Sequence, residues 1–84
     1  MKELLFVSNF EVAVKYFRTQ SRMESDGICC YGIYVEKYVG DELTEEGHSG
    51  FISENEGYVN CLLARLSEGL VMPSSLNEIL DEIY

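Results

Sequence analysis

The hydrophobic pattern of this 84-residue chain changes its period at Ser53, and this change restricts the fold more than any other feature. Before Ser53, apolar and polar residues tend to alternate, which is typical of strands with one covered face. After Ser53, apolar residues recur at helical spacing. A chain of this size buries only about 60–65% of its unfolded surface, so it has room for a single core. We therefore expect one small α+β domain over residues 1–84, with the sheet first and the helices last.

The first half predicts three antiparallel strands, at residues 11–22, 28–39 and 42–52. Asp26-Gly27 and Gly40-Asp41 are expected to form the turns, because tight hairpins favour residues that adopt a positive φ. Two glycines weaken the pattern of the third strand, which indicates irregular pairing. In the first strand Val12, Val14 and Tyr16 share one face. In the second strand Tyr31, Ile33, Val35 and Val39 share the face that is expected to lie in the core.

Two segments of the first half do not alternate. Leu4 to Val7 is continuously apolar, so it either extends the first strand or adds a short one. Phe17 interrupts the alternation of residues 11–22, which indicates that both faces of that strand are partly covered.

Two amphipathic helices are expected after the sheet. Ser53 with Glu56, and Ser75 with Glu78, match the capping-box pattern of a helix start. Gly69 is placed to end the first helix as a left-handed residue. The apolar stripes are Val59, Leu62, Leu63 and Leu66 in the first helix, and Leu76, Ile79, Leu80 and Ile83 in the second. Both helices are expected to pack on one face of the three-stranded sheet.

The charge is strongly acidic and unevenly distributed. Fifteen acidic and six basic residues give a formal net charge of −9, and residues 40–84 hold ten of the acids but only Arg65 among the bases. Nucleic acids and anionic membranes attract basic surfaces, so both are disfavoured as partners, whereas a basic protein partner, or simple solubility, fits better. The bases that could gather on the predicted hairpin are Lys15, Arg18, Arg22 and Lys37.

The start of the chain and its cysteines indicate a cytoplasmic protein. The first apolar run has four residues, which is shorter than the core of a secretion signal. Cys29 and Cys30 are adjacent and would point to opposite faces of a strand, so with Cys61 they do not form a disulfide framework. Reduced thiols are expected.

The sequence favours no catalytic centre, metal site or cofactor. His48 is the only histidine, and the three cysteines lack the CxxC spacing of zinc ligands. Glycine-rich phosphate loops are absent from the sequence. One alternative keeps a chemical role open: a small ligand-binding domain or enzyme that uses His48, the nearby Glu45 or Glu46, and a thiol.

Tyrosines mark the one candidate interaction face. Tyr34 and Tyr38 share the outward face of their strand, and Tyr16 is expected nearby across the hairpin. Tyrosine is enriched at protein interfaces, which supports a binding role. The alternative is that these rings pack against one another across strands without binding anything.

Three segments resemble a known group of proteins. They are the strand Tyr31–Glu36, the Ser53-capped helix with Val59, Leu62 and Leu66, and the ending from Pro73 to Glu82. Together they are similar, over roughly residues 28–84, to a family of small uncharacterised proteins from Gram-positive, clostridia-like bacteria. The resemblance implies a small bacterial cytoplasmic protein and brings no functional residues. From the absence of catalytic groupings and the uneven charge, we expect a non-catalytic interaction or regulatory module that binds a protein partner or forms a homodimer, through the Tyr34/Tyr38 sheet face or the acidic second half.

Overall fold

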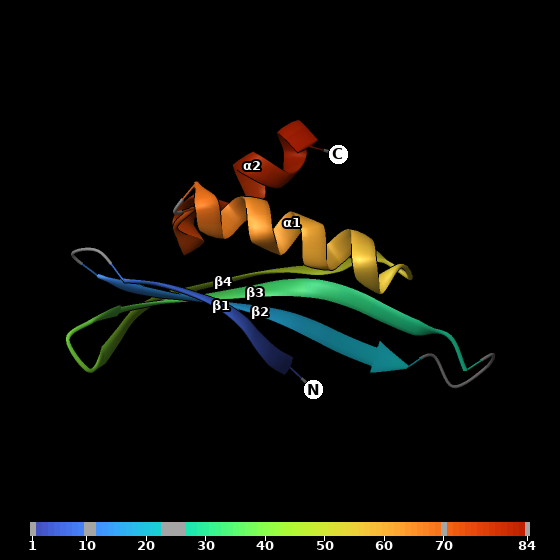
Figure 1. Cartoon of the computed structure of the whole chain (residues 1–84), viewed down its shortest axis with the longest axis horizontal. Coiled ribbons are helices and arrows are strands. Elements are labelled where there is room, and N and C mark those ends of the chain that lie inside the picture. Colours follow the sequence, from blue (N-terminus) through green and yellow to red (C-terminus); the bar gives the residue numbers. More distant parts are fainter. Residues whose placement is uncertain (1, 10–11, 23–26, 70, 84) are drawn as a thin grey trace.

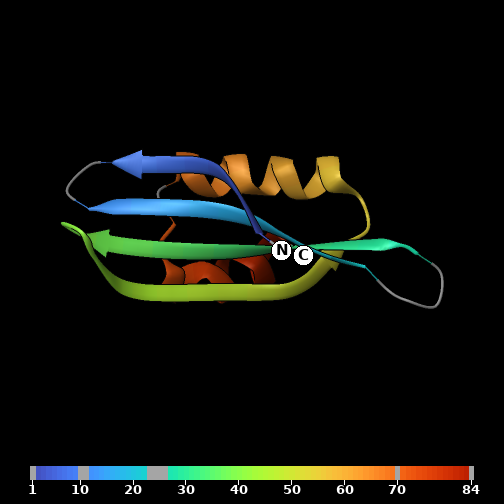
Figure 2. The same ribbon diagram turned by 90° about the horizontal axis from the view of Figure 1, so that it is seen from below.

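The computed structural model describes residues 2–9, 12–22, 27–69 and 71–83 and shows an α+β fold. The elements are β1 (Lys2–Asn9), β2 (Ala13–Arg22), β3 (Cys29–Val39), β4 (Glu42–Ser53), α1 (Glu56–Glu68), a 3-10 turn (Pro73–Ser75) and α2 (Leu76–Ile83). The four strands form an antiparallel meander in the order β1-β2-β3-β4. Figure 1 shows α1 and α2 on the same side of the sheet. Figure 2 shows the other side, where no helix lies in front of the strands.

The strand β1 corrects the expected three-stranded sheet. Leu4 to Val7 lies inside this eight-residue strand, which pairs with β2. The register shifts between Leu4 and Phe6, so Leu4 and Val7 both lie on the face opposite to Phe6. A bulge of this kind inserts an extra residue and breaks the period-two pattern. This is why the continuous apolar run from Leu4 to Val7 did not by itself predict a separate strand.

The other strands confirm the hairpin arrangement with small changes at their ends. β2 begins at Ala13 rather than residue 11, and residues 23–26 of the expected first turn lie outside the described residues. The second turn is confirmed, because Gly40 has a φ of 64° between the paired residues Val39 and Glu42. β4 is irregular as expected, with Gly50 at a φ of 73° and three shifts in its register with β3.

The core lies between the sheet and the helices. Its buried side chains are Val14, Tyr16, Tyr31, Ile33, Val35, Ile52, Val59, Leu62, Leu63, Leu66, Leu76 and Leu80. Helix α1 packs mainly over β1, β2 and β3, while the 3-10 turn and α2 pack over β4. Val39, expected in the core, is 53% exposed because it is the last residue of β3 beside the Gly40 turn.

The helix ends differ from the expected capping pattern. Ser53 is still paired with Tyr31 in the sheet, so the N-cap is Asn55, whose side-chain oxygen accepts a hydrogen bond from the Tyr58 N–H at 3.0 Å. Ser75 lies in the 3-10 turn that leads directly into α2. Gly69 has a φ of −84°, so it ends α1 without the left-handed conformation.

Candidate interaction face

The face of the sheet turned away from the helices, here called the open face, carries four rows of side chains in register. From β1 to β4 the rows are Lys2, Thr19, Gly32 and Phe51; Leu4, Phe17, Tyr34 and His48; Val7, Lys15, Glu36 and Glu46; and Asn9, Ala13, Tyr38 and Leu43. Alternation explains the placement, since Val14, Tyr16, Ile33 and Val35, which lie between these residues on β2 and β3, are in the core. Figure 2 looks onto this face.

Aromatic rings and lysines occupy its centre. Phe17 and Tyr34 meet edge to face, with ring centroids 5.7 Å apart. The Lys2 ammonium lies 4.2 Å from the Tyr34 ring centroid and 4.8 Å from that of Phe17. The Lys15 ammonium lies 4.7 Å from the Tyr38 centroid. Such cation–π contacts hold the long lysine side chains flat over the rings.

Two carboxylates complete the open face. Glu36 is only 8% exposed although no helix covers it, because Lys2, Tyr34 and Tyr38 surround it. Its oxygens accept hydrogen bonds of 3.3 Å from both tyrosine hydroxyls and lie 3.6 Å from the Lys2 ammonium. The Tyr34 hydroxyl also bonds to Glu46. The acids therefore hold the rings in fixed positions.

The hydrogen bond to Glu46 raises the pKa of Tyr34 well above its usual value, and burial and the charge of Glu36 raise it further. A raised pKa means that the fold favours the neutral phenol over the phenolate. The resulting stabilisation is complete below the pKa of an unfolded tyrosine, about 10, and is lost as the pH rises above that value.

A spectrophotometric titration tests this arrangement. At pH 11, the absorbance of ionised tyrosine should be lower in the folded protein than in denaturant, because Tyr34 stays protonated. In the variant Tyr34→Phe this difference should shrink, and the free energy of unfolding should fall less between pH 9 and 11. An unchanged difference would show that Tyr34 does not bond to Glu46 in solution.

The structure brings together only two of the three tyrosines expected on the interaction face. Tyr34 and Tyr38 lie on the open face, but Tyr16 is fully buried in the core and donates a hydrogen bond to the Val71 carbonyl at 3.1 Å. The reason is the register, because Tyr16 pairs with Val35 and Phe17 pairs with Tyr34. The interrupted alternation at Phe17 was the sequence signal for this ring on the open face.

The residues of the alternative chemical site are not assembled. His48 is exposed on the open face opposite Tyr34, and Glu46 lies on the same face. Glu45 forms an ion pair with Lys37 at 3.0 Å. Cys61 is exposed on α1, a helix that lies on the other side of the sheet from the open face. Within the described residues there is no pocket and no group of three or more metal-ligating side chains.

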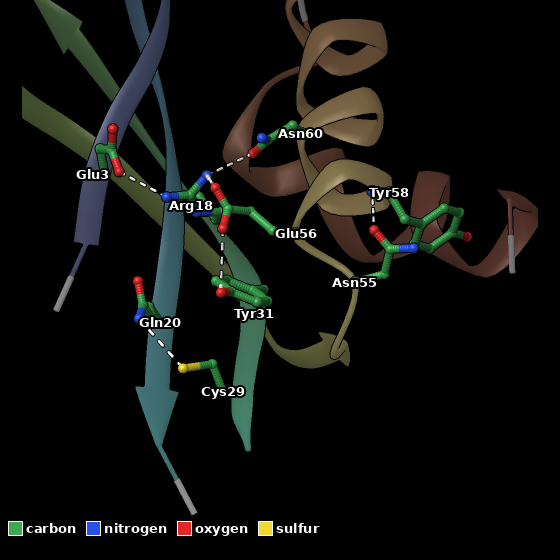
Figure 3. A network of polar contacts seen from close by, with 9 residues as sticks. All are labelled: Glu3, Arg18, Gln20, Cys29, Tyr31, Asn55, Glu56, Tyr58 and Asn60. Carbon is green, nitrogen blue, oxygen red and sulfur yellow. Dashed lines mark hydrogen bonds and ion pairs between the residues drawn. The ribbon is translucent and has the colours of Figure 1, made fainter. Parts of the chain in front are cut away.

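The basic residues that could have gathered on the hairpin are separated. Lys15 lies on the open face, whereas Arg18 is 7% exposed beneath α1. Arg18 donates hydrogen bonds to Glu3 at 2.7 Å, to Glu56 at 3.0 Å and to Asn60 at 2.9 Å (Figure 3). Tyr31 donates to Glu56 at 3.3 Å. This Arg18 cluster connects three strands to the first turns of α1, which is a structural role.

Comparison with known proteins identifies the family of this chain. The chain belongs to a family described as "Family of unknown function (DUF6514)", whose model matches residues 2–84. The match includes the first two strands, which the sequence resemblance did not cover. Neither the curated proteins nor the solved structures contain a match to this chain. None of the helices in the described part of the chain combines the length and the hydropathy that a membrane span requires.

Proposed function

We propose that this DUF6514 chain is a non-catalytic protein-interaction module and that the open face is its binding surface. The observation that carries the proposal is the apolar character of this uncovered face. Leu4, Val7, Leu43 and Phe51 are each between 42% and 62% exposed, and Leu4 pairs with Phe17 of the Phe17–Tyr34 ring pair. A solvated sheet face is normally polar, and contiguous exposed apolar groups mark interaction sites.

The charge of the open face supports a protein partner. Its basic residues Lys2 and Lys15 are matched by the acidic Glu36 and Glu46. The net charge of −9 therefore resides elsewhere on the chain. A balanced face with aromatic residues at its centre resembles the core of a protein interface rather than a surface for nucleic acid or an anionic membrane.

A double variant of the open face tests the proposal. Leu4→Asp with Phe51→Asp changes two exposed side chains on the edge strands, so the fold should be retained. We expect this variant to lose the assembly that the wild-type chain forms. That assembly is either a homo-oligomer, seen as a larger mass in light scattering, or a complex with a protein captured from the host. The control is Tyr58→Asp, which adds one carboxylate at a 42% exposed side chain on α1 instead.

The control variant should assemble as the wild type does. The proposal fails if the wild-type chain is a monomer that captures nothing, or if the open-face variant keeps every assembly of the wild type. Circular dichroism of all three proteins shows whether the variants are folded.

A further inference from the structure

We infer that the Lys2 side chain, here called the strap, closes over the aromatic centre of the open face and must be released before a partner reaches the rings. The inference rests on the proposed function and specifies how its binding surface is regulated. It starts from a difference in exposure. Phe17 and Tyr34 are partly buried although no helix covers them, whereas Leu4 and Phe51 on the same face are 45% and 62% exposed.

The start of β1 brings the strap to the rings. The bulge between Leu4 and Phe6 bends this edge strand, because an extra residue interrupts the regular pairing with β2. Figure 1 shows the start of β1 on the side of the sheet away from the helices, and Figure 2 shows it crossing in front of β2 toward β3. Lys2 pairs with Thr19 of β2, so the strap begins one row away from the ring pair.

The strap then contacts groups on both neighbouring strands. Its ammonium lies 4.8 Å from the ring centroid of Phe17 on β2 and 4.2 Å from that of Tyr34 on β3. It also lies 3.6 Å from the carboxylate of Glu36, which is almost fully buried. The other lysine of the open face, Lys15, lies over the ring of Tyr38 at 4.7 Å. Lys2 is therefore the residue that covers the Phe17–Tyr34 pair and is anchored beyond it.

The contacts that close the strap are individually weak. The Lys2 side chain is 46% exposed, and an ion pair or a cation–π contact at such a site favours the closed position by a few-fold at most. Together these contacts favour the closed strap by about tenfold. The strap is thus closed in most molecules, yet it opens without separating the strands.

A closed strap affects binding in two ways. A partner that packs on the rings binds only the molecules with an open strap, so its affinity is about tenfold lower than for a permanently open face. In the free chain, the strap also reduces the exposed apolar area at the centre of the face, and such area promotes nonspecific association. The strap therefore favours a partner that contacts enough of the face to displace it.

Nuclear magnetic resonance detects the closed strap directly. Protons held above the plane of an aromatic ring resonate upfield, so the methylene protons beside the Lys2 ammonium should be shifted upfield in the wild type. Lys37 provides the reference signal, because its ammonium pairs with Glu45 at 3.0 Å. In the variant Glu36→Gln, which removes the charge that anchors the strap, the upfield shift of Lys2 should become smaller.

A neutral dye, Nile red, tests whether the strap covers the rings. Its affinity for the folded chain should rise about five- to tenfold in Lys2→Ala. Lys37→Ala makes the same change in net charge outside the open face and should bind the dye as the wild type does. Lys2→Arg keeps a cation that stacks on rings and pairs with a carboxylate, so it should stay within about twofold of the wild type. Circular dichroism verifies the fold of each variant.

Two results would overturn the inference: a Lys2 signal without an upfield shift in the wild type, or a dye affinity that Lys2→Ala leaves unchanged. The assembly assay separates the inference from the proposed function. If the wild type assembles through the open face and Lys2→Ala does not assemble more tightly, the partner binds without displacing the strap, and only the inference fails. If the strap is closed but the wild type neither oligomerises nor captures a protein, the proposed function fails.

Discussion

Replacing Gly32 with alanine is expected to lower the free energy of unfolding by about 3 kcal/mol, as measured by denaturant unfolding. A Cβ atom at this position would lie 2.0 Å from the Gly50 carbonyl oxygen and 2.8 Å from the Thr19 hydroxyl. The nearer atom belongs to the backbone of β4, so a rotamer change cannot relieve the contact. The strands β3 and β4 would have to separate where their register already shifts.

The control for this variant is Gly57→Ala in the first turn of α1. There the nearest atom to an added Cβ is the Asn55 side-chain oxygen at 3.4 Å, an ordinary contact distance. Alanine is a better helix former than glycine, so this variant should be unchanged or more stable by a few tenths of a kcal/mol. If Gly32→Ala is within about 1 kcal/mol of the wild type, the close approach of β3 and β4 does not exist in solution.

The order of sheet and helices could be predicted from the sequence because burial on one face imposes a period on each element. Alternation around Val14 and Ile33 predicted strands, and the spacing of Leu62 and Leu66 predicted a helix. β1 was left open because the bulge at Leu4 and Phe6 removes its alternation. The N-cap was predicted two residues too early because Ser53 still pairs with β3, which the capping pattern cannot show.

The candidate site was predictable only in part, because faces depend on the register between strands. Tyr34 and Tyr38 lie on one face of β3 by alternation alone. Whether Tyr16 or Phe17 lies beside them depends on the pairing of β2 with β3, and a shift by one residue exchanges the two. The burial of Arg18 depends on partners from β1 and α1, far away in the sequence.

Arg18→Ala is the second substitution with a large expected effect, and it should also lower the free energy of unfolding by about 3 kcal/mol. The alanine variant loses hydrogen bonds to Glu3, Glu56 and Asn60 and the contact of the guanidinium with the Tyr31 ring, 5.4 Å from its centroid. It also leaves a space between β2 and α1. The side chains of Glu3 and Glu56 are 61% and 51% exposed, so water can hydrate them in the variant. The loss in the free energy of unfolding is therefore at the lower end of the range for breaking a buried ion pair.

Two further variants show whether the cost comes from the shape of the guanidinium or from its charge. Arg18→Lys keeps the charge, but a single ammonium cannot bond to β1 and α1 at the same time, so it should recover less than half of the loss. Lys15→Ala removes a base from the same strand on the open face, where it contacts one ring, and should cost less than about 1 kcal/mol. Full recovery with lysine would mean that Arg18 acts as a charge among acids and does not connect α1 to the sheet. In that case hydrogen exchange should show the first turn of α1 equally protected in Arg18→Lys and in the wild type. If Arg18 does connect α1 to the sheet, this turn should be the first part of α1 to lose protection in Arg18→Lys.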